Sequence, residues 1–227
     1  MNGEIISVND SAMDIKEVTI KLDREIRFLN GQYVMISFED KSKDRHAYSI
    51  LSHDKISNTI TLLVKAAGEF TKKLMHSKPG DSIFVYGPYG KFTLKKNKKN
   101  IFIAGGIGIV PLYSIMMDAL SKEDSENYST HLFYSCRYFH EMALYNELKD
   151  LKESDASADL SINFYFTREG GMDRFTVEDI KRISDYSEYD YYICGPDPMM
   201  GHIVNNLKAI GIDEKQIYTE SFVLENN

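Results

Sequence analysis

From residue 101 onward, short apolar strands alternate with amphipathic helices, and this pattern limits the possible fold more than any other feature of the sequence. The strands begin at Ile101, His131, Ile162, Tyr191 and Ile217, and helices are expected near residues 111–120, 141–151, 176–183 and 198–210. Apolar strands separated by helices form parallel sheets that are covered on both faces. The pattern predicts a doubly wound α/β domain with a five-stranded parallel sheet, a fold class that binds nucleotides.

The first 95 residues show a different pattern, in which alternating segments are separated by turn-forming residues. The segments are Ile15–Leu22, Tyr33–Phe38, Ile60–Lys65 and Ser82–Tyr86, and the turns include Asn30-Gly31 and Pro79-Gly80-Asp81. Alternation with frequent turns is typical of antiparallel sheets. We expect an antiparallel β-barrel, interrupted by one short helix over 70–76. A lysine-rich run follows, and we place the two domains at residues 1–97 and 98–227.

The composition excludes several classes of function. Cys136 and Cys194 lack the spacing of a zinc or iron-sulfur site, so we expect no metal centre, and any redox group must be an organic cofactor. The net charge of −7 argues against nucleic-acid binding, which needs an excess of Lys and Arg. The basic residues at 95–99 fit a solvated linker or a docking patch for an acidic electron carrier. Without a long apolar run or a signal-peptide pattern, we expect a cytoplasmic protein with no membrane segment.

A glycine-rich turn follows the strand at Ile101. Gly105, Gly106 and Gly108 lead into Pro111 and a helical pattern. Glycines allow a tight bend and close approach to a pyrophosphate, and the start of a helix favours an anion. Pro111 is well tolerated in a first helical turn. A tight connection without a ligand is the alternative, but the position after the first strand of the sheet favours a nucleotide site.

A second loop of this kind, Cys194-Gly195-Pro196, follows the strand at Tyr191 and precedes a helix that contains Met199. Because parallel strands end at the same edge of a sheet, both loops should emerge there together. A cysteine in such a loop is either an inert buried thiol or a residue beside a reacting ring. We expect the second role for Cys194.

Together these segments resemble the ferredoxin-NADP reductase superfamily, in which a flavin-binding barrel precedes a nicotinamide-binding domain. The matching stretches are Gly31-Gln32-Tyr33, Tyr48-Ser49, Gly68 to Leu74, Pro79-Gly80-Asp81, Gly87-Pro88-Tyr89-Gly90, Gly105 to Pro111 and Cys194-Gly195-Pro196. They occur in the family's order and span nearly the whole chain. The resemblance implies a flavoenzyme with bound FAD, and FMN is the less favoured alternative.

By this resemblance, Tyr48 packs against the isoalloxazine ring, with cross-strand packing as the alternative, and Ser49 hydrogen-bonds the flavin nitrogen that accepts hydride. Thr71 and the amides at the start of its helix correspond to the flavin pyrophosphate site, although Thr71 also fits a simple helix cap. Glu220 corresponds to a carboxylate near the reactive nitrogen, and Phe222 to an aromatic residue that covers the flavin. The barrel residues assigned to the cofactor also include Val64, Gly68 and Phe70.

One position departs from the family. The family reads Arg-x-Tyr-Ser where this chain has His46 two residues before Tyr48, with Arg45 one place earlier. Adjacent strand residues point to opposite faces. Either His46 replaces the arginine as a weaker, pH-dependent phosphate partner, or a local bulge lets Arg45 reach the site.

The choice of nicotinamide depends on Thr167-Arg168-Glu169 and Arg174. This stretch resembles a segment of bacterial reductases that surrounds the 2′-phosphate of NADP, and guanidinium groups bind phosphate through charge-assisted hydrogen bonds. Glu169 and Asp173 are nearby carboxylates of the kind that an NAD-selective site presents to the ribose. Solvated or salt-bridged arginines on an exposed loop are the alternative. Arg137, after the preceding strand, could assist with ribose or pyrophosphate. We expect NADPH rather than NADH as the donor.

These expectations describe an enzyme that transfers hydride from NADPH to bound FAD and then passes electrons to a separate acceptor such as ferredoxin or flavodoxin. The residues expected at the reaction are Ser49, Cys194 and Glu220. One alternative is an NAD(P)H:flavin oxidoreductase that uses flavin as a substrate. The other is a non-catalytic electron-transfer subunit that keeps the fold as a binding module.

Overall fold

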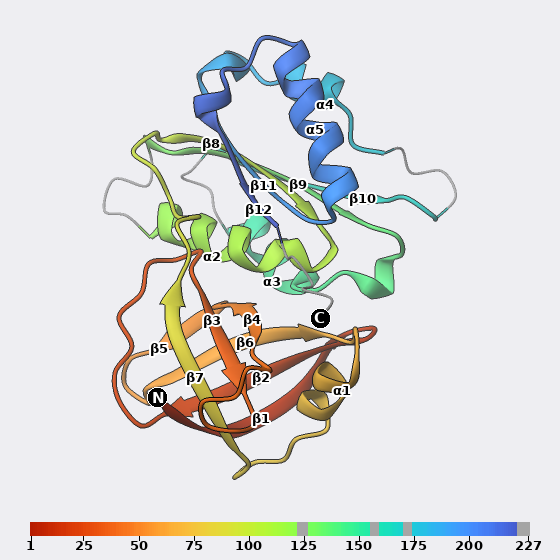
Figure 1. Ribbon diagram of the computed structural model, residues 1–227. Helices are drawn as coiled ribbons and strands as arrows, with labels where there is room; N and C mark the ends of the chain where they lie inside the picture. Colours follow the sequence, from red (N-terminus) through yellow and green to blue (C-terminus); the bar gives the residue numbers. More distant parts are fainter. Residues whose placement is uncertain (122–126, 155–158, 170–173, 222–227) are drawn as a thin grey trace. The chain divides into compact units, whose positions relative to one another are not determined.

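The computed structural model of the chain describes residues 1–121, 127–154, 159–169 and 174–221. Its contacts divide the chain into two compact units, Met1–Thr93 and Leu94–Asn227. Each unit has its own sheet and its own hydrophobic core (Figure 1). The predicted boundary between residues 97 and 98 lies just after this division.

The N-terminal unit, in which every residue is described, is an antiparallel sheet of seven strands in the order β4-β3-β7-β1-β2-β6-β5. The strands are β1 (Asn2–Ala12), β2 (Ile15–Leu22), β3 (Tyr33–Ser37), β4 (His46–Ser49), β5 (Ser52–Asp54), β6 (Thr59–Lys65) and β7 (Ser82–Tyr89), and one helix, α1, covers Glu69–Met75. β4 and β5 stand at opposite ends of this order, yet only Ile50 and Leu51 separate them in sequence. The sheet therefore curls until its two ends approach each other, as the predicted barrel requires.

Alternate residues of the strands form the core of this unit. In β2, Val18 and Ile20 are fully buried, and its bounds coincide with those of the predicted strand. β1 is not among the predicted strands, because its apolar alternation is weak, and in the structure Ile5 is its only buried residue. Pairing of β1 with β2 and β7 through the backbone builds it into the sheet instead.

The C-terminal unit confirms the predicted five-stranded parallel sheet, in the order β10-β9-β8-β11-β12. Its strands are β8 (Lys99–Gly105), β9 (Ser129–Cys136), β10 (Asp159–Phe166), β11 (Asp190–Cys194) and β12 (Ile217–Glu220). Its α-helices are α2 (Ile109–Leu120), α3 (Tyr145–Ser154), α4 (Val177–Lys181) and α5 (Asp197–Ala209), and short 3₁₀ helices cover η1 (Gly106–Gly108), η3 (Phe139–Glu141), η4 (Tyr186–Glu188) and η5 (Glu214–Gln216). The strand order reverses between β8 and β11, which is where doubly wound sheets bind their ligands.

Helices cover both faces of this parallel sheet, with α4 and α5 on one side and α2 and α3 on the other (Figure 1). Ile101 and Ile103 of β8 face the first pair and share a core with Ile180 of α4 and Leu207 of α5. The intervening Phe102 stacks on Tyr192 of β11, with ring centroids 5.1 Å apart. Both faces of the central strands are therefore apolar, which explains why these strands read as continuous apolar runs. Among the described residues, no helix is both long and apolar enough to cross a membrane.

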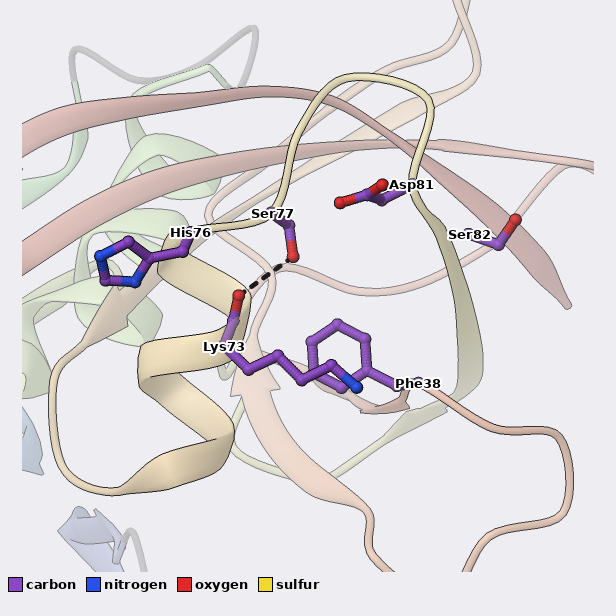
Figure 2. Close-up of a pocket in the computed structure, with 6 residues that line it drawn as sticks. All are labelled: Phe38, Lys73, His76, Ser77, Asp81 and Ser82. Atoms are coloured by element: carbon purple, nitrogen blue, oxygen red, sulfur yellow. Dashed lines mark hydrogen bonds between the residues drawn. The ribbon is translucent and has the colours of Figure 1, made fainter.

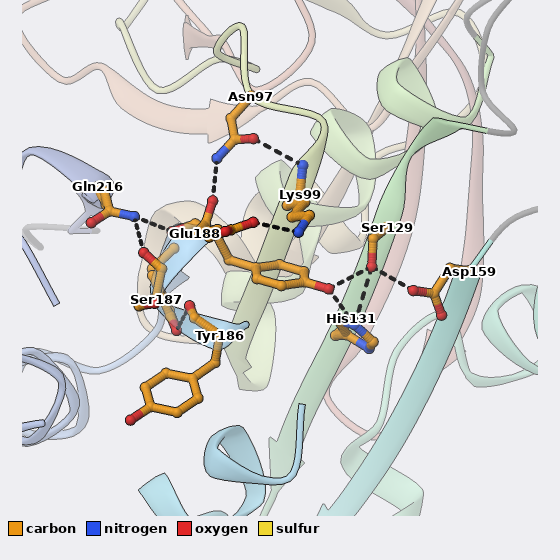
Figure 3. A network of polar contacts seen from close by, with 11 residues as sticks. Asn97, Lys99, Ser129, His131, Asp159, Tyr186, Ser187, Glu188 and Gln216 are labelled. Carbon is orange, nitrogen blue, oxygen red and sulfur yellow. Dashed lines mark hydrogen bonds and ion pairs between the residues drawn. The ribbon is translucent and has the colours of Figure 1, made fainter. Parts of the chain in front are cut away.

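A partly buried polar network around His131 joins the beginnings of β9 and β10. The imidazole of His131 lies with Nδ1 2.6 Å from the hydroxyl of Ser161 and with Nε2 3.3 Å from the hydroxyl of Tyr189. Ser129 donates a hydrogen bond of 2.7 Å to the carboxylate of Asp159, and Figure 3 shows Ser129 between His131 and Asp159. Burial lowers the pKa of His131 below 6.5, and the charge of Asp159 offsets this effect only in part. His131 is therefore a neutral structural residue at the amino edge of the sheet.

We expect the free energy of unfolding to decrease as the pH falls below 6.5, the ordinary pKa of the His131 side chain. The unfolded chain takes up a proton at this pH, whereas the buried imidazole resists protonation, so acid favours unfolding. A His131→Asn variant should lose part of this pH dependence, while His202→Asn, at an exposed position of α5, should keep it. Urea unfolding at about pH 8 and about pH 5.5 measures the effect, and the same pH dependence in wild type and His131→Asn would contradict it.

Candidate functional site

The glycine turn after β8 exposes backbone at the start of α2. Gly106 has a φ of +53°, in the left-handed region, and a Cβ atom built there would meet no other atom within 4 Å. The following helix α2 has no side-chain hydrogen bond at its N-cap, Gly108. Pro111 lies in the first turn of α2, as predicted from its sequence position. The turn thus has open space beside the backbone of Gly106 and leads into the positive end of a twelve-residue helix. This arrangement suits a phosphate group.

The turn after β8 and the loop after β11 pack directly against each other. A Cβ atom on Gly105 would lie 2.5 Å from the sulfur of Met199 and 2.9 Å from Cδ of Pro196. One on Gly108 would lie 2.5 Å from the carbonyl carbon of Cys194, and one on Gly195 would lie 3.0 Å from Cα of Gly105. The two loops therefore emerge at one edge of the sheet, as expected. Close packing explains these three glycines, whereas Gly106 is the glycine that leaves space for a ligand.

A thiol and a carboxyl group lie at the neighbouring ends of β11 and β12. Cys194 and Glu220 are paired in the strand register, and Cys194 is fully buried. Burial raises the pKa of the Cys194 thiol, with a smaller contribution from Glu220, so the thiol stays protonated. Burial also raises the pKa of Glu220 to about 7, and its Oε2 atom has no hydrogen-bond partner among the described residues. Their roles beside a nicotinamide ring stay predictions.

Ser221, directly after Glu220, is joined to the start of α5. The hydroxyl of Ser221 donates a hydrogen bond of 2.6 Å to Asp197, the first residue of α5. Phe222, which the resemblance assigns to covering the flavin, lies outside the described residues.

In the N-terminal unit, the predicted flavin residues of β4 are buried. Tyr48 is 9% exposed and belongs to the core of the unit, and Ser49 is also buried. Burial, with the charge of Asp44, raises the pKa of Tyr48, so its hydroxyl stays neutral. The side chain of Val64 is fully buried in the same core, which leaves only its backbone to contact a cofactor. Cross-strand packing thus accounts for Tyr48, and its contact with a flavin ring stays a prediction.

The two basic residues at the position that departs from the family point to different partners. The ring of His46 stacks on Phe70 of α1, with centroids 3.8 Å apart, and its Nε2 atom lies 2.7 Å from a carboxylate oxygen of Asp44. The guanidinium of Arg45 lies 3.8 Å above the ring of Tyr86 in β7. The register of β3 with β4 is regular from His46 onward, so the described strand contains no bulge that would redirect Arg45. His46 is therefore the basic residue beside α1.

The start of α1 is organised by Thr71. Its hydroxyl accepts hydrogen bonds of 2.9 Å from the amides of Ala67 and Gly68 and donates one of 2.8 Å to the carbonyl of Gly68. These bonds correspond to the helix-cap interpretation of Thr71. A Cβ atom on Gly68 would meet nothing within 4 Å, so the backbone before the helix is open. This open backbone beside His46 fits a phosphate of the dinucleotide, and the assignment stays a prediction.

A hollow of about 460 Å³ lies at the other end of α1 and is lined by Phe38, Lys73, His76, Ser77, Asp81 and Ser82. Figure 2 shows the amine of Lys73 reaching over the ring of Phe38, at 4.0 Å, while His76 points away. None of the predicted cofactor residues lines this hollow. We therefore do not assign a cofactor to it.

The loops after β9 and β10 are held together by backbone bonds that continue the strand pairing. The amide of Thr167 donates to Cys136 and that of Arg168 to Arg137, both at 2.9 Å. Arg137 makes two hydrogen bonds to the carboxylate of Glu141, of 3.1 and 2.5 Å. Its guanidinium is therefore already paired, which weakens its predicted role in binding ribose or pyrophosphate.

The side chains of Arg168 and Arg174 are exposed, and neither has an ion-pair partner among the described residues. The carboxylate of Glu169 accepts a hydrogen bond of 2.6 Å from the amide of Phe139. Asp173, the other nearby carboxylate, lies outside the described residues. Of the two, only Arg168 is tied by its backbone to the end of β9 in the part of the chain that the structure describes, and the contact of both arginines with a 2′-phosphate stays a prediction.

Two features of this edge could not be predicted from the sequence. One is the position of Phe139, and the other is the hydrogen bond by which Glu169 accepts from the amide of Phe139. The only signal for Phe139 was an aromatic residue in the loop that follows the predicted strand at His131. The described residues contain no cluster of three or more side chains suited to a metal ion.

Two family descriptions match the chain, and together they cover both units. "Oxidoreductase FAD-binding domain" matches residues 3–94, and "Oxidoreductase NAD-binding domain" matches residues 102–205. The chain is 29% identical over 233 residues to the phenol hydroxylase P5 protein of Acinetobacter pittii, covering 96% of this chain and 64% of that protein. The chain therefore spans just under two thirds of that relative's length.

Two further relatives extend these matches. A probable dihydroorotate dehydrogenase B (NAD(+)) electron transfer subunit of Thermococcus kodakarensis is 28% identical, with 96% of this chain and 83% of that protein covered. The solved structure of phthalate dioxygenase reductase superimposes with a TM-score of 0.79 at 22% identity and covers 100% of this chain and 69% of the reductase. At that identity the superposition supports the fold alone.

Proposed function

Because the chain belongs to the ferredoxin reductase family, with its FAD-binding and NAD-binding oxidoreductase domains, we propose that it oxidises NADPH and passes the electrons to a separate acceptor. Bound FAD would supply the redox chemistry by accepting hydride and releasing electrons. The observation that carries this proposal is the meeting of two glycine loops at the ends of β8 and β11, where Gly106 leaves backbone open to a pyrophosphate.

The residues of the C-terminal unit would bind and orient the nucleotide. The turn at Gly106 and the start of α2 would hold the pyrophosphate through amide groups. The loop at Cys194 would form a wall beside the nicotinamide, and its buried neutral thiol would exclude water without adding charge. Glu220, with a pKa of about 7, is able to hold or release a proton at neutral pH.

The residues of the N-terminal unit would hold the flavin. Ser49 would hydrogen-bond the ring as donor or acceptor, and Tyr48 would lie against it as a neutral aromatic side chain. His46 would stand near the phosphates in place of the family's arginine. An imidazole makes fewer charge-assisted bonds than a guanidinium, so we expect the flavin to be bound less tightly than with an arginine at this position.

The preference for NADPH is supported by two exposed arginines, Arg168 directly after β10 and Arg174 before α4. Neither is neutralised by a partner among the described residues, and Glu169 is engaged by a backbone amide. A 2′-phosphate would therefore meet positive charge at this edge, which favours NADPH over NADH.

The acceptor is proposed from the relatives' names. The phenol hydroxylase protein belongs to an oxygenase by its name, and the Thermococcus relative is an electron transfer subunit. We propose a separate electron-transfer protein as the acceptor, either an iron-sulfur or haem protein, with ferredoxin as the specific candidate, or a flavodoxin, which carries a flavin. Because this chain spans 83% of the Thermococcus subunit, a role as an electron-transfer subunit of a larger complex is the second candidate.

We expect the purified protein to be yellow, to keep non-covalent FAD after desalting, and to bleach under anaerobic conditions faster with NADPH than with NADH. The residues proposed for the flavin ring and for its phosphates, in β4 and at the start of α1, belong to one compact unit, which favours stable binding. Absorption spectra before and after each donor is added measure the result. Loss of the flavin on desalting, with activity restored by free flavin, would favour flavin as a substrate. A colourless protein that neither FAD nor FMN reconstitutes would contradict the proposal.

A further inference from the structure

We propose that Phe139 is the stacking platform for the adenine base of the nucleotide and that Glu169 is the positioning residue that holds this platform in place. The inference rests on the proposed function, because it names the part of the C-terminal unit that receives the adenosine half of the donor. Neither residue has a predicted role in binding the adenine base.

Phe139 is unusually exposed for its size. Among the described residues of the C-terminal unit it is the only large apolar side chain that is exposed, with 48% of its surface accessible. The rings of Tyr145 and Phe166 pack nearly perpendicular to it, with centroids 4.8 and 5.7 Å away. An aromatic ring that is held from the side and open to solvent suits stacking of a flat base.

Hydrogen bonds place Phe139 next to the arginine expected to bind the 2′-phosphate. The amide of Arg168 is bonded to the carbonyl of Arg137, two residues before Phe139, and Glu169 accepts from the amide of Phe139 itself. Only the ribose ring separates the base from the 2′-phosphate in NADPH, so their binding residues must be neighbours. The loops after β9 and β10 satisfy this condition.

Glu169 could act in two opposite ways. A carboxylate that faced the ribose would bind its hydroxyls and repel a 2′-phosphate. In the structure the carboxylate instead forms a charge-assisted hydrogen bond of 2.6 Å to the amide at the start of η3. This contact fixes the first residue of η3, which is Phe139, relative to Arg168.

The test is calorimetric binding of 5′-AMP and 2′,5′-ADP to the full chain, with circular dichroism to verify the fold of each variant. Phe139→Leu keeps an apolar contact with Tyr145 but removes the flat ring, so it should weaken both ligands by about tenfold and by equal factors. Phe139→Tyr, the matched control, should bind both as wild type does. Glu169→Ala should also weaken both ligands, whereas Glu169→Gln keeps an acceptor for the amide and should restore most of the affinity.

Unchanged binding in Phe139→Leu would overturn the platform. Tighter binding of 2′,5′-ADP, but not of 5′-AMP, in both Glu169 variants would show that Glu169 faces the ribose and would overturn its positioning role. A wild-type protein that binds neither ligand would contradict the proposed NADPH function itself. This last outcome is distinct from the other two, in which the wild type still binds.

Discussion

Replacing Gly108 with alanine should destabilise the C-terminal unit by about 3 kcal/mol or more, at the upper end of the cost of overpacking. The new Cβ atom would lie 2.5 Å from the carbonyl carbon of Cys194 and 2.7 Å from the amide nitrogen of Gly195. These are backbone atoms of the loop after β11, which unlike a flexible side chain are unable to rotate away. The two loops would have to separate, and the edge expected to hold the nucleotide would be distorted.

Gly201→Ala is a matched control for this substitution. Gly201 lies inside α5, and a Cβ atom there would meet no atom within 4 Å. Because alanine favours a helix more than glycine does, this variant should be more stable by about 0.5–1 kcal/mol. Denaturant unfolding with hydrogen exchange of β8 and β11 measures both effects within the C-terminal unit. If Gly108→Ala were as stable as the wild type, the close packing of the two loops would not exclude a side chain at position 108.

Arg168→Ala should lower kcat/KM for NADPH by about tenfold or more, which corresponds to ~1.4 kcal/mol, and should leave kcat/KM for NADH nearly unchanged. The backbone of Arg168 is fixed by its bond to Arg137, and its exposed side chain has no ion-pair partner among the described residues. A guanidinium in this state is available for a 2′-phosphate, which only NADPH carries.

Steady-state kinetics with both donors measure this difference. Arg182→Ala is the control, because Arg182 is an exposed arginine of the same unit whose guanidinium is paired with Asp179 at 3.0 Å. That variant should keep the wild-type ratio of kcat/KM values. Equal losses with NADPH and NADH in Arg168→Ala, or a wild type that prefers NADH, would show that the phosphate assignment is wrong.

The fold of the C-terminal unit was predictable because its central strands are apolar on both faces. All residues of β11 are buried, and such a run between two helical patterns has few interpretations. In the N-terminal unit prediction was less complete. The eleven residues of β1 bury only Ile5, so long-range backbone pairing and not side-chain pattern defines that strand.

For the candidate site, local sequence indicated the two glycine loops, because a glycine turn between a strand and a helix is a local feature. Local sequence could not show which glycines are needed for packing and which one leaves space for a ligand. A side chain at Gly105, Gly108 or Gly195 would clash with the facing loop, whereas Gly106 faces open space. That distinction exists only once β8 and β11 lie side by side.

The sequence by itself determined the division into two domains and the positions of the glycine loops that follow two of the parallel strands. It also determined which residue types are available to bind a flavin and a nicotinamide. Only the tertiary structure decided which charged groups remain free. Arg137 is paired with Glu141, Arg45 lies on Tyr86, and Glu169 is bound to the amide of Phe139. The physical reason is that strand periodicity and glycine turns are encoded over a few neighbouring residues, whereas the partner of a charged side chain depends on which distant segments the fold brings within hydrogen-bond distance.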